Sequence, residues 1–317
     1  MKNIYLNIKK FNEKSLKSAI SFLKENHVLG IPTETVYGLG GNAYSDLAVR
    51  RIYKIKSRTK KNPLIIHYYS IKDALKDVEV NENFLKIYKK FCPGPITLIV
   101  KKKSNSKISK YASAELQTVG IRFPNHSLTR KLLKKINFPL AMPSANKSKN
   151  ISPVSAYDVY DEFGSSIKMI LDGGESKIGV ESTIVDVRND IKILRPGFVT
   201  SMKIKKLLKK NIKIKRKSNQ IISPGNLGKH YSPGIPMILN ALSAPKKYAF
   251  ICFGKEKSNH PNSFNLSTNG NLEEAARNLY KILRKIKNLK YKKIYVKKIP
   301  NKGIGLAIND RIKRASN

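Results

Sequence analysis

Hydrophobic and polar positions follow two rhythms over the first two hundred residues, one typical of helices and one typical of strands. Four segments carry apolar residues at helical spacing, which predicts amphipathic helices: 15–26, 45–58, 81–91 and 125–136. Short runs rich in β-branched residues, with Gly, Pro or Asn at their ends, predict strands: 28–31, 64–69, 96–102, 118–123, 139–145, 169–174 and 182–187. The alternation predicts a mixed α/β domain with a substantial sheet.

The pattern changes near residue 200. A basic helix is predicted over 200–211, and prolines and glycines then crowd the stretch up to residue 236, which predicts irregular structure. A smaller α/β unit follows, with strands at 247–254 and 292–299, helices at 271–288 and within 303–316, and a polar surface loop at 257–271. We therefore expect three parts: a first domain over 1–203, a linker over 204–236 and a second domain over 237–317.

Length and composition narrow the class of protein. The chain has 317 residues, which favours two domains, and 40% of them are apolar, as in folded proteins. No apolar run reaches 18 residues and the start has no apolar segment typical of a signal peptide, so we expect a cytoplasmic protein without a membrane span. Cys92 and Cys252 are far apart, which argues against a disulfide framework or a cysteine-based zinc site.

The formal net charge of +42 has two explanations. It predicts attraction to a polyanion such as tRNA, weakening as salt rises. It also fits an AT-rich genome, because residues with AT-rich codons (Lys, Asn, Ile and Tyr) are abundant and tryptophan is absent. Lysines are spread over every region, which favours the second explanation for most of the charge and leaves weak RNA binding as an expectation.

Candidate chemistry lies in seven segments that place small, polar and basic residues beside predicted strands. They are 32–40, 56–67, 92–98, 118–124, 142–153, 179–183 and 194–197. Ligands bind at strand ends in open α/β sheets, so convergence of these segments would make a site for a large, charged ligand. The glycines of IPTETVYGLGGNA fit neither a P-loop nor a dinucleotide fingerprint.

The motifs PTETVYGLG, K-x-R followed by NPL, PGPxT, GIRFP, PSAN followed by SP, GVEST and LRPG occur here in that order. Together they resemble the YrdC-type threonylcarbamoyl-AMP synthases. KHYSP and GIGLAINDRIKRAS resemble the longer, two-domain branch of that family. The resemblance implies a YrdC-like α/β catalytic domain with a large twisted mixed sheet, and a smaller Rossmann-like α/β domain at the C-terminus.

The same resemblance implies an activity. Enzymes of this family join L-threonine, bicarbonate and ATP into threonylcarbamoyl-AMP and pyrophosphate, for the t6A modification of tRNA. The expected partners are these substrates and the downstream tRNA-transfer machinery, and Mg²⁺ is expected to arrive with ATP. No G-x-S-x-G motif or Ser/His/Asp order predicts a nucleophilic side chain. The alternatives are a non-catalytic RNA binder and a carbamoyl-transfer module of the hydrogenase-maturation type, which would need zinc fingers and more length.

Lys56 and Arg58 are the candidate catalytic residues. Lysine offers a mobile charge and arginine a forked donor for the ATP phosphates, and Asn62 adds a neutral donor. Their segment is otherwise one more solvated lysine run. The functional interpretation is favoured because the basic stretch leads directly into the predicted strand at 64–69.

Arg122 is the candidate partner of the threonine carboxylate. Strand alternation places it opposite Ile121 and Phe123, and a buried arginine needs an anion. An internal pair with Glu34 or Glu181 is the alternative. The resemblance implies further threonine contacts, which are Thr35, His67, Met142 and Ser182; a lone histidine beside a strand is otherwise more often structural.

The remaining candidates concern ATP. The resemblance implies contacts from Thr118, Ser144, Asn146, Ser152 and Arg195, with Ser152 expected at a helix start, where free N–H groups favour phosphate. Ordinary turn and N-cap chemistry is the alternative for the serines.

In the linker, His230 and Tyr231 predict a lid over the nucleotide, with a passive tether as the alternative. Two residues depart from the family pattern: Lys149 replaces a usual glycine, and Gly228 replaces a usual aromatic residue.

Overall fold

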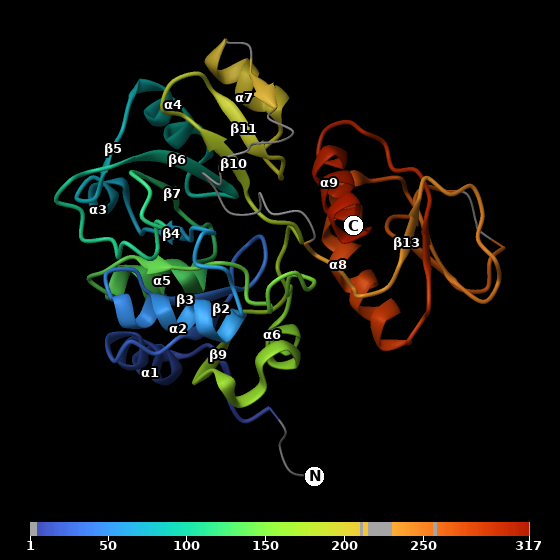
Figure 1. Ribbon diagram of the computed structural model, residues 1–317, viewed down its shortest axis with the longest axis horizontal. Helices are drawn as coiled ribbons and strands as arrows, with labels where there is room; N and C mark the ends of the chain where they lie inside the picture. Colours follow the sequence, from blue (N-terminus) through green and yellow to red (C-terminus); the bar gives the residue numbers. More distant parts are fainter. Residues whose placement is uncertain (1–4, 210–211, 215–229, 256–258, 317) are drawn as a thin grey trace.

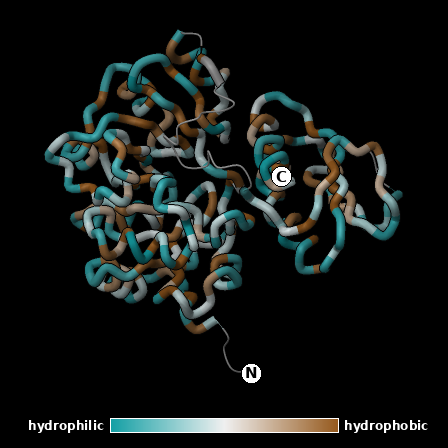
Figure 2. Tube along the Cα trace, viewed as in Figure 1, coloured by the Kyte–Doolittle hydropathy of each residue, from teal (hydrophilic) through white to brown (hydrophobic). Residues whose placement is uncertain are grey.

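The computed structural model describes residues 5–209, 212–214, 230–255 and 259–316. These residues form two α/β units that lie beside each other (Figure 1). Gly228, which departs from the family pattern, lies outside the described residues, as does most of the linker before it. Hydrophobic residues follow the strands of both units, and hydrophilic residues follow the outer loops (Figure 2).

Within the described residues, twelve strands of the first unit form one mixed sheet. Their order is β1-β9-β2-β3-β8-β4-β7-β6-β10-β11-β12, and β5 pairs with β6. The strands are β1 Ile8–Lys10, β2 Leu29–Ile31, β3 Gly38–Asn42, β4 Ile65–His67, β5 Val78–Glu79, β6 Ile96–Lys102, β7 Thr118–Arg122, β8 Leu140–Ala141, β9 Met169–Asp172, β10 Thr183–Asp186, β11 Lys192–Arg195 and β12 Lys213–Ile214. The mixed α/β fold and its large sheet confirm the sequence prediction.

Helices cover both faces of this sheet, and alternate residues of one strand enter different cores. Leu140 of β8 packs with α1 and α5, whereas Ala141 packs in the cluster that holds α2, α4 and α7. The helical elements of the unit are α1 Glu13–Lys24, α2 Asp46–Lys56, α3 Ile71–Ala74, α4 Glu82–Phe91, α5 Ser127–Lys135, α6 Ala156–Phe163, the short 3₁₀ helix η1 Gly164–Ser166 and α7 Ser201–Leu208. Short polar caps start most of them; at α2, for example, Ser45 Oγ accepts from Ala48 N at 3.2 Å.

The glycines after residue 37 lie in β3, a strand that is absent from those predicted from the sequence. β3 pairs antiparallel with β2, with Gly38 opposite Ile31 and Gly40 opposite Leu29. A Cβ atom at Gly38 would collide with Met142, and one at Gly40 with Ile31. The strand therefore needs glycine because neighbouring side chains fill the space above it.

The second unit is a parallel sheet with the order β13-β16-β14-β15. Its elements are β13 Met237–Leu239, β14 Ala249–Cys252, β15 Ser263–Asn265, α8 Leu272–Asn288, β16 Ile294–Val296 and α9 Gly305–Ser316. β15 falls within the segment predicted as a loop. Figure 1 shows α8 and α9 on the side that faces the first unit. The core of the second unit also includes Val36, Val180 and Tyr231, so the two units share one hydrophobic cluster.

The first unit continues beyond the predicted boundary at 203. That boundary falls inside α7, whose Ile204 and Leu208 pack in the core of the first unit. After α7, β12 pairs with β11 in the large sheet. In the part of the chain that the structure describes, no helix is long and apolar enough to cross a membrane.

Candidate active site

A cavity with about 560 Å³ of empty space, its open mouth included, lies where several strands of the large sheet end. It is lined by Thr33, Val36, Tyr37, Gly38, Arg58, Ile65, His67, Arg122, Met142, Pro143, Ser144, Glu181, Ser182, Arg195, His230 and Tyr231. Six of the seven segments singled out in the sequence contribute to this wall, as does the linker. The seventh, 92–98, acts indirectly, because Thr97 Oγ1 lies 2.7 Å from Ser182 Oγ.

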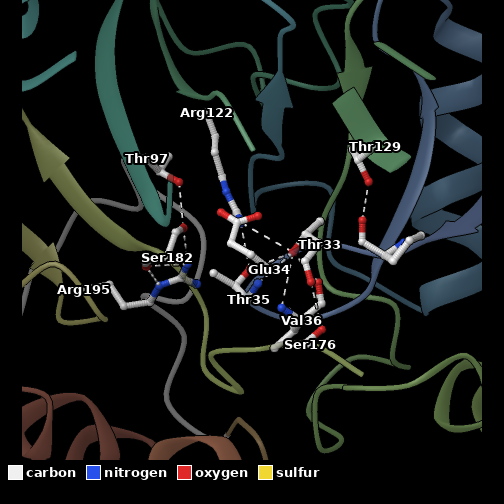
Figure 3. Close-up of polar contacts among 11 residues, drawn as sticks. Thr33, Glu34, Thr35, Val36, Thr97, Arg122, Thr129, Ser176, Ser182 and Arg195 are labelled. Atoms are coloured by element: carbon white, nitrogen blue, oxygen red, sulfur yellow. Dashed lines mark hydrogen bonds and ion pairs between the residues drawn. The ribbon is translucent and has the colours of Figure 1, made fainter. Parts of the chain in front are cut away.

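Arg122 stands at the end of β7 and faces the cavity, while Ile121 and Phe123 enter the core, as alternation predicted. Its Nη2 donates to Glu34 Oε1 at 2.8 Å and to Thr35 Oγ1 at 2.9 Å (Figure 3). Its Nε and Glu34 Oε2 are buried and have no hydrogen-bond partner among the described residues. This ion pair thus leaves one donor, Arg122 Nε, and one acceptor, Glu34 Oε2, without a hydrogen-bond partner among the described residues.

His67 lies beside Arg122, because β4 and β7 are parallel and the register pairs these two residues. Its Nδ1 is 3.2 Å from the carbonyl oxygen of Ile65. Burial and the Arg122 charge hold the pKa of His67 well below its ordinary value, so the ring is neutral near pH 7. Met142 lines the same part of the cavity.

The turn after β2 is shaped by Thr33, a residue the sequence analysis missed. Its hydroxyl donates to the Val36 carbonyl at 2.6 Å and accepts from the amides of Thr35 and Val36. Thr35 is fully buried and contacts Arg122 without lining the cavity itself. Thr33 therefore positions the loop, and Thr35 acts through Arg122.

Ser182 and Arg195 also line the cavity and contact each other (Figure 3). Arg195 donates from Nε and Nη2 to the Ser182 carbonyl at 3.1 and 3.0 Å, and from Nη2 to its hydroxyl at 3.2 Å. Burial lowers the pKa of Arg195. Both residues line the cavity, as predicted.

Lys56 is buried, but it does not line the cavity. Its Nζ donates to the carbonyls of Ser144 and Asn146. Burial, and then the nearby Arg58, hold its pKa well below the ordinary value. In this structure Lys56 fixes the turn that carries Ser144, instead of facing the ligand as predicted.

Arg58 does line the cavity. Its Nε and Nη2 donate to the carbonyls of Asn62 and Pro63 at 3.1 and 3.0 Å, and burial lowers its pKa to about 10. Asn62 thus holds Arg58 through its backbone, while its own Oδ1 is buried without a partner among the described residues.

Three other predicted ATP residues lie away from the cavity wall. Asn146 donates to the carbonyls of Lys147 and Asn150. Ser152 does not start a helix, because α6 begins at Ala156 with Ser155 as its cap. Thr118 occupies the first position of β7, four residues before Arg122 and therefore roughly 13 Å from it along the strand.

Glu181 lines the cavity and was not among the predicted site residues. It accepts hydrogen bonds from Ser152 Oγ at 2.6 Å, from the Tyr280 hydroxyl at 3.0 Å and from Arg311 Nε at 2.9 Å. Burial alone would raise the pKa of Glu181, but Arg311, Arg195 and Ser152 together lower it to about 2. Two of its three partners belong to the second unit.

His230 and Tyr231 also line the cavity, which places the described end of the linker over it. Their rings are 4.1 Å apart, and Tyr231 stacks on Tyr280 at 5.9 Å. Burial lowers the pKa of His230 to about 3. His230 Nδ1 and the Tyr231 hydroxyl are buried without partners among the described residues.

Comparison with known proteins identifies the family. A family model described as "Telomere recombination" matches residues 21–197, and one described as "Threonylcarbamoyl-AMP synthase, C-terminal domain" matches 199–317. The threonylcarbamoyl-AMP synthase of Pyrococcus abyssi is 34% identical over 99% of this chain and 97% of its own length. That of Bacillus subtilis is 35% identical over 96% and 94%. The chain belongs to the threonylcarbamoyl-AMP synthase family.

Solved structures of this family share the whole fold. A crystal structure of P. abyssi Sua5 complexed with L-threonine has a TM-score of 0.89, with 32% identity, covering 98% of this chain and 96% of that one. A variant of the same protein, with a histidine and the following tyrosine replaced by alanine, has a TM-score of 0.90 with the same identity and coverage. The predicted two-domain synthase architecture is confirmed.

Proposed function

We propose that this protein is a threonylcarbamoyl-AMP synthase, which joins L-threonine, bicarbonate and ATP and releases pyrophosphate. One observation carries the proposal. Arg58 and Arg195 line the same part of the cavity, and in the part of the chain that the structure describes neither of them forms an ion pair. Their hydrogen bonds go to backbone carbonyls and one serine hydroxyl, so their positive charge is available to a polyanion such as a triphosphate.

Two buried groups of the cavity lining also have no partner among the described residues: His230 Nδ1 and the Tyr231 hydroxyl. Buried groups of this kind normally find a partner, and a nucleotide would supply several. We propose that Arg58, Arg195 and Ser144 contact the ATP phosphates, with Lys56 holding the Ser144 turn.

The other side of the cavity suits threonine. Arg122 keeps its Nε donor for a carboxylate, although Nη2 already binds Glu34. His67, Met142 and Ser182 would surround the remainder of the amino acid. We propose that Thr35 acts there through Arg122 and that Thr33 sets the shape of the loop.

The reaction needs positioning more than side-chain chemistry. Attack of the threonine amine on bicarbonate forms the C–N bond of a carbamate and releases water. A carbamate oxygen then bonds to the α-phosphorus of ATP, and the bond from that phosphorus to the bridging oxygen breaks to release pyrophosphate. The step transfers a nucleotidyl group, and Arg58 and Arg195 would balance the charge on the leaving phosphates.

Magnesium would reach the cavity on the ATP phosphates. Both carboxylates nearby are already engaged, Glu34 by Arg122 and Glu181 by Arg311, Tyr280 and Ser152. We propose that the ion shields the phosphates when it is bound. His230 and Tyr231 would act as a lid that keeps water from the carbamate and the adenylate.

The test is threonine-dependent release of pyrophosphate. Purified protein is incubated with ATP, L-threonine, bicarbonate and Mg²⁺, and each component is omitted in turn. We expect pyrophosphate release only with the complete mixture, and no release when a chelator removes Mg²⁺. Absence of release, together with tight and salt-sensitive RNA binding, would contradict the proposal and support the RNA-binding alternative. We expect the reaction in the cytoplasm, where the product would pass to the tRNA-transfer machinery.

A further inference from the structure

The second unit reaches into the cavity wall at one carboxylate. Glu181 is 5% exposed, belongs to the first unit, and lines the cavity beside Ser182 and Arg195. A bare carboxylate there would repel a triphosphate and would compete with it for the guanidinium of Arg195. The site therefore needs something that neutralises Glu181 from behind.

Arg311 of α9 meets that need. Its side chain is fully buried, and its Nε donates to Glu181 Oε2 at 2.9 Å. Tyr280 of α8 adds a hydroxyl that lies 3.0 Å from each carboxylate oxygen. Both donors come from the unit that carries none of the predicted substrate contacts.

Arg311 is itself held in place from several directions. Its Nη1 donates to the Pro196 carbonyl at 2.7 Å and to Asp310 Oδ2 at 3.0 Å. Its guanidinium carbon lies 5.5 Å from the centre of the Tyr231 ring, within the range of a cation–π contact. One side chain thus connects the turn that carries Glu181, the turn after Arg195 and the linker aromatic residue.

The charges at this wall then balance in a particular way. Glu181 is paired with Arg311, whereas Arg195 donates its hydrogen bonds to Ser182. Both Arg311 and Arg195 lower the pKa of Glu181. If the Arg311 charge were removed, Arg195 would be the guanidinium left to compensate the Glu181 carboxylate. The cation that we assign to ATP would be diverted to an internal carboxylate.

We propose that Arg311, supported by Tyr280, is a positioning residue for the reaction: it neutralises Glu181 from the second unit and so keeps Arg195 available for the ATP phosphates. The second unit is then a functional part of the nucleotide side of the cavity. This inference rests on the proposed function for the identity of the nucleotide.

The test separates charge from packing in the full-length protein. Arg311→Met removes the charge and keeps most of the apolar stem, and we expect the KM for ATP to rise at least tenfold while the KM for threonine changes less than twofold. Arg311→Lys keeps a cation and should recover most of the loss. Glu181→Gln in the Arg311→Met background removes the uncompensated carboxylate and should also recover ATP use.

A matched control is Arg277→Met. Arg277 of α8 also bridges the two units, donating to the Lys177 carbonyl at 3.0 Å, but it lies on the surface and outside the cavity wall. We expect its KM values to be unchanged. Equal rises for both substrates in Arg311→Met, or additive losses in the double variant, would overturn the proposal and leave Arg311 a purely structural residue.

Two measurements keep the test decisive. If Arg311→Met does not fold, Tyr280→Phe removes a single hydroxyl and should raise the KM for ATP about threefold, with no change for threonine; an unchanged value would count against the proposal. ATP binding is also measured by calorimetry, without turnover. Wild-type protein that binds ATP but releases no pyrophosphate would refute the proposed function, while a binding loss confined to Arg311→Met would still support the neutralising role.

Discussion

Two buried glutamates are each paired with an arginine at the cavity: Glu181 lines it, and Glu34 binds Arg122, which lines it. Glu34 binds Arg122 at 2.8 Å, and both residues belong to the first unit. Glu181 binds Arg311 at 2.9 Å, and this pair joins the two units. The two pairs have similar burial, so the difference between them is the origin of the arginine.

The two pairs therefore differ in which unit supplies the arginine: the first unit supplies Arg122, and the second unit supplies Arg311. The side that we assign to threonine is built from strands and turns of the large sheet, and its arginine faces the cavity. On the nucleotide side, the arginine of the pair stands behind the carboxylate, and other cations face the cavity. We therefore expect changes at Arg122 to affect mainly threonine use, and changes at Arg311 to affect mainly ATP use.

The largest effect is expected for Arg58→Ala. Loss of a partly buried cation that would balance charge on the leaving phosphates should lower pyrophosphate release by roughly 100-fold or more. The measurement is the steady-state rate at saturating threonine, with thermal unfolding as a check on the fold. Lys60→Ala is the control, because Lys60 is an exposed neighbour in the same basic run. Equal losses in both variants would favour the solvated-lysine interpretation.

A smaller and more selective effect is expected for Arg122→Lys. Lysine keeps the charge that Glu34 needs but lacks the Nε donor, so the KM for threonine should rise about tenfold and that for ATP should not change. Arg188→Lys is the matched control. Arg188 does not line this cavity, and it forms a forked ion pair with Asp186 through hydrogen bonds of 2.9 and 2.8 Å. If threonine use is unaffected in Arg122→Lys, the carboxylate partner has been assigned wrongly.

Strand alternation and motif order predicted much of this site. The orientation of Arg122 required only a period of two, and the seven ordered motifs brought nine predicted residues to one cavity: Arg58, His67, Arg122, Met142, Ser144, Ser182, Arg195, His230 and Tyr231. Lys56 shows where such reasoning fails. Lys56 is the last residue of α2 and donates to the carbonyls of Ser144 and Asn146, whereas Arg58 lies beyond the helix end and lines the cavity; the K-x-R spacing alone does not distinguish these two environments.

Long-range contacts were beyond the sequence. Glu181 stands in the recognised motif GVEST, but its partner Arg311 is 130 positions later, and no local pattern links them. An acid among basic motifs was the available signal, because a buried carboxylate must find a cation. The strand of glycines, β3, was missed for a similar reason: its geometry depends on Ile31 of β2 and on Met142, which follows β8, and both pack against it.

Mild acid should lower the free energy of unfolding through the histidines that line the cavity. His67 and His230 each have a pKa below the unfolded value near 6.5, so the unfolded chain binds more protons as the pH falls below 6.5, and the free energy of unfolding decreases. One such group contributes at most about 1.4 kcal/mol per pH unit. Glu181 adds nothing in this range, because the stability from its low pKa is lost only below about pH 4.5.

The free energy of unfolding is measured by denaturant titration at pH 7.5, 6.5 and 5.5. His67→Asn should lose less stability on acidification than wild type, because it removes one of the histidines whose pKa is lowered in the folded protein. His27→Asn is the control, since His27 lies near Glu25 at the surface. Identical pH profiles for His67→Asn and wild type would show that His67 does not contribute.

The smallest effect is expected at Lys149, where the nucleotide side meets the linker. Its φ of 76° is in the left-handed region that glycine adopts without strain, and its carbonyl accepts from Ser232 N at 2.8 Å. The turn therefore keeps a glycine-like backbone although lysine stands there. Lys149→Gly should raise the free energy of unfolding by up to about 1 kcal/mol, because relief of strain exceeds the added chain entropy. Lys147→Gly, two residues earlier and without a positive φ, should be neutral or destabilising; equal effects in the two variants would show that the left-handed turn carries no strain.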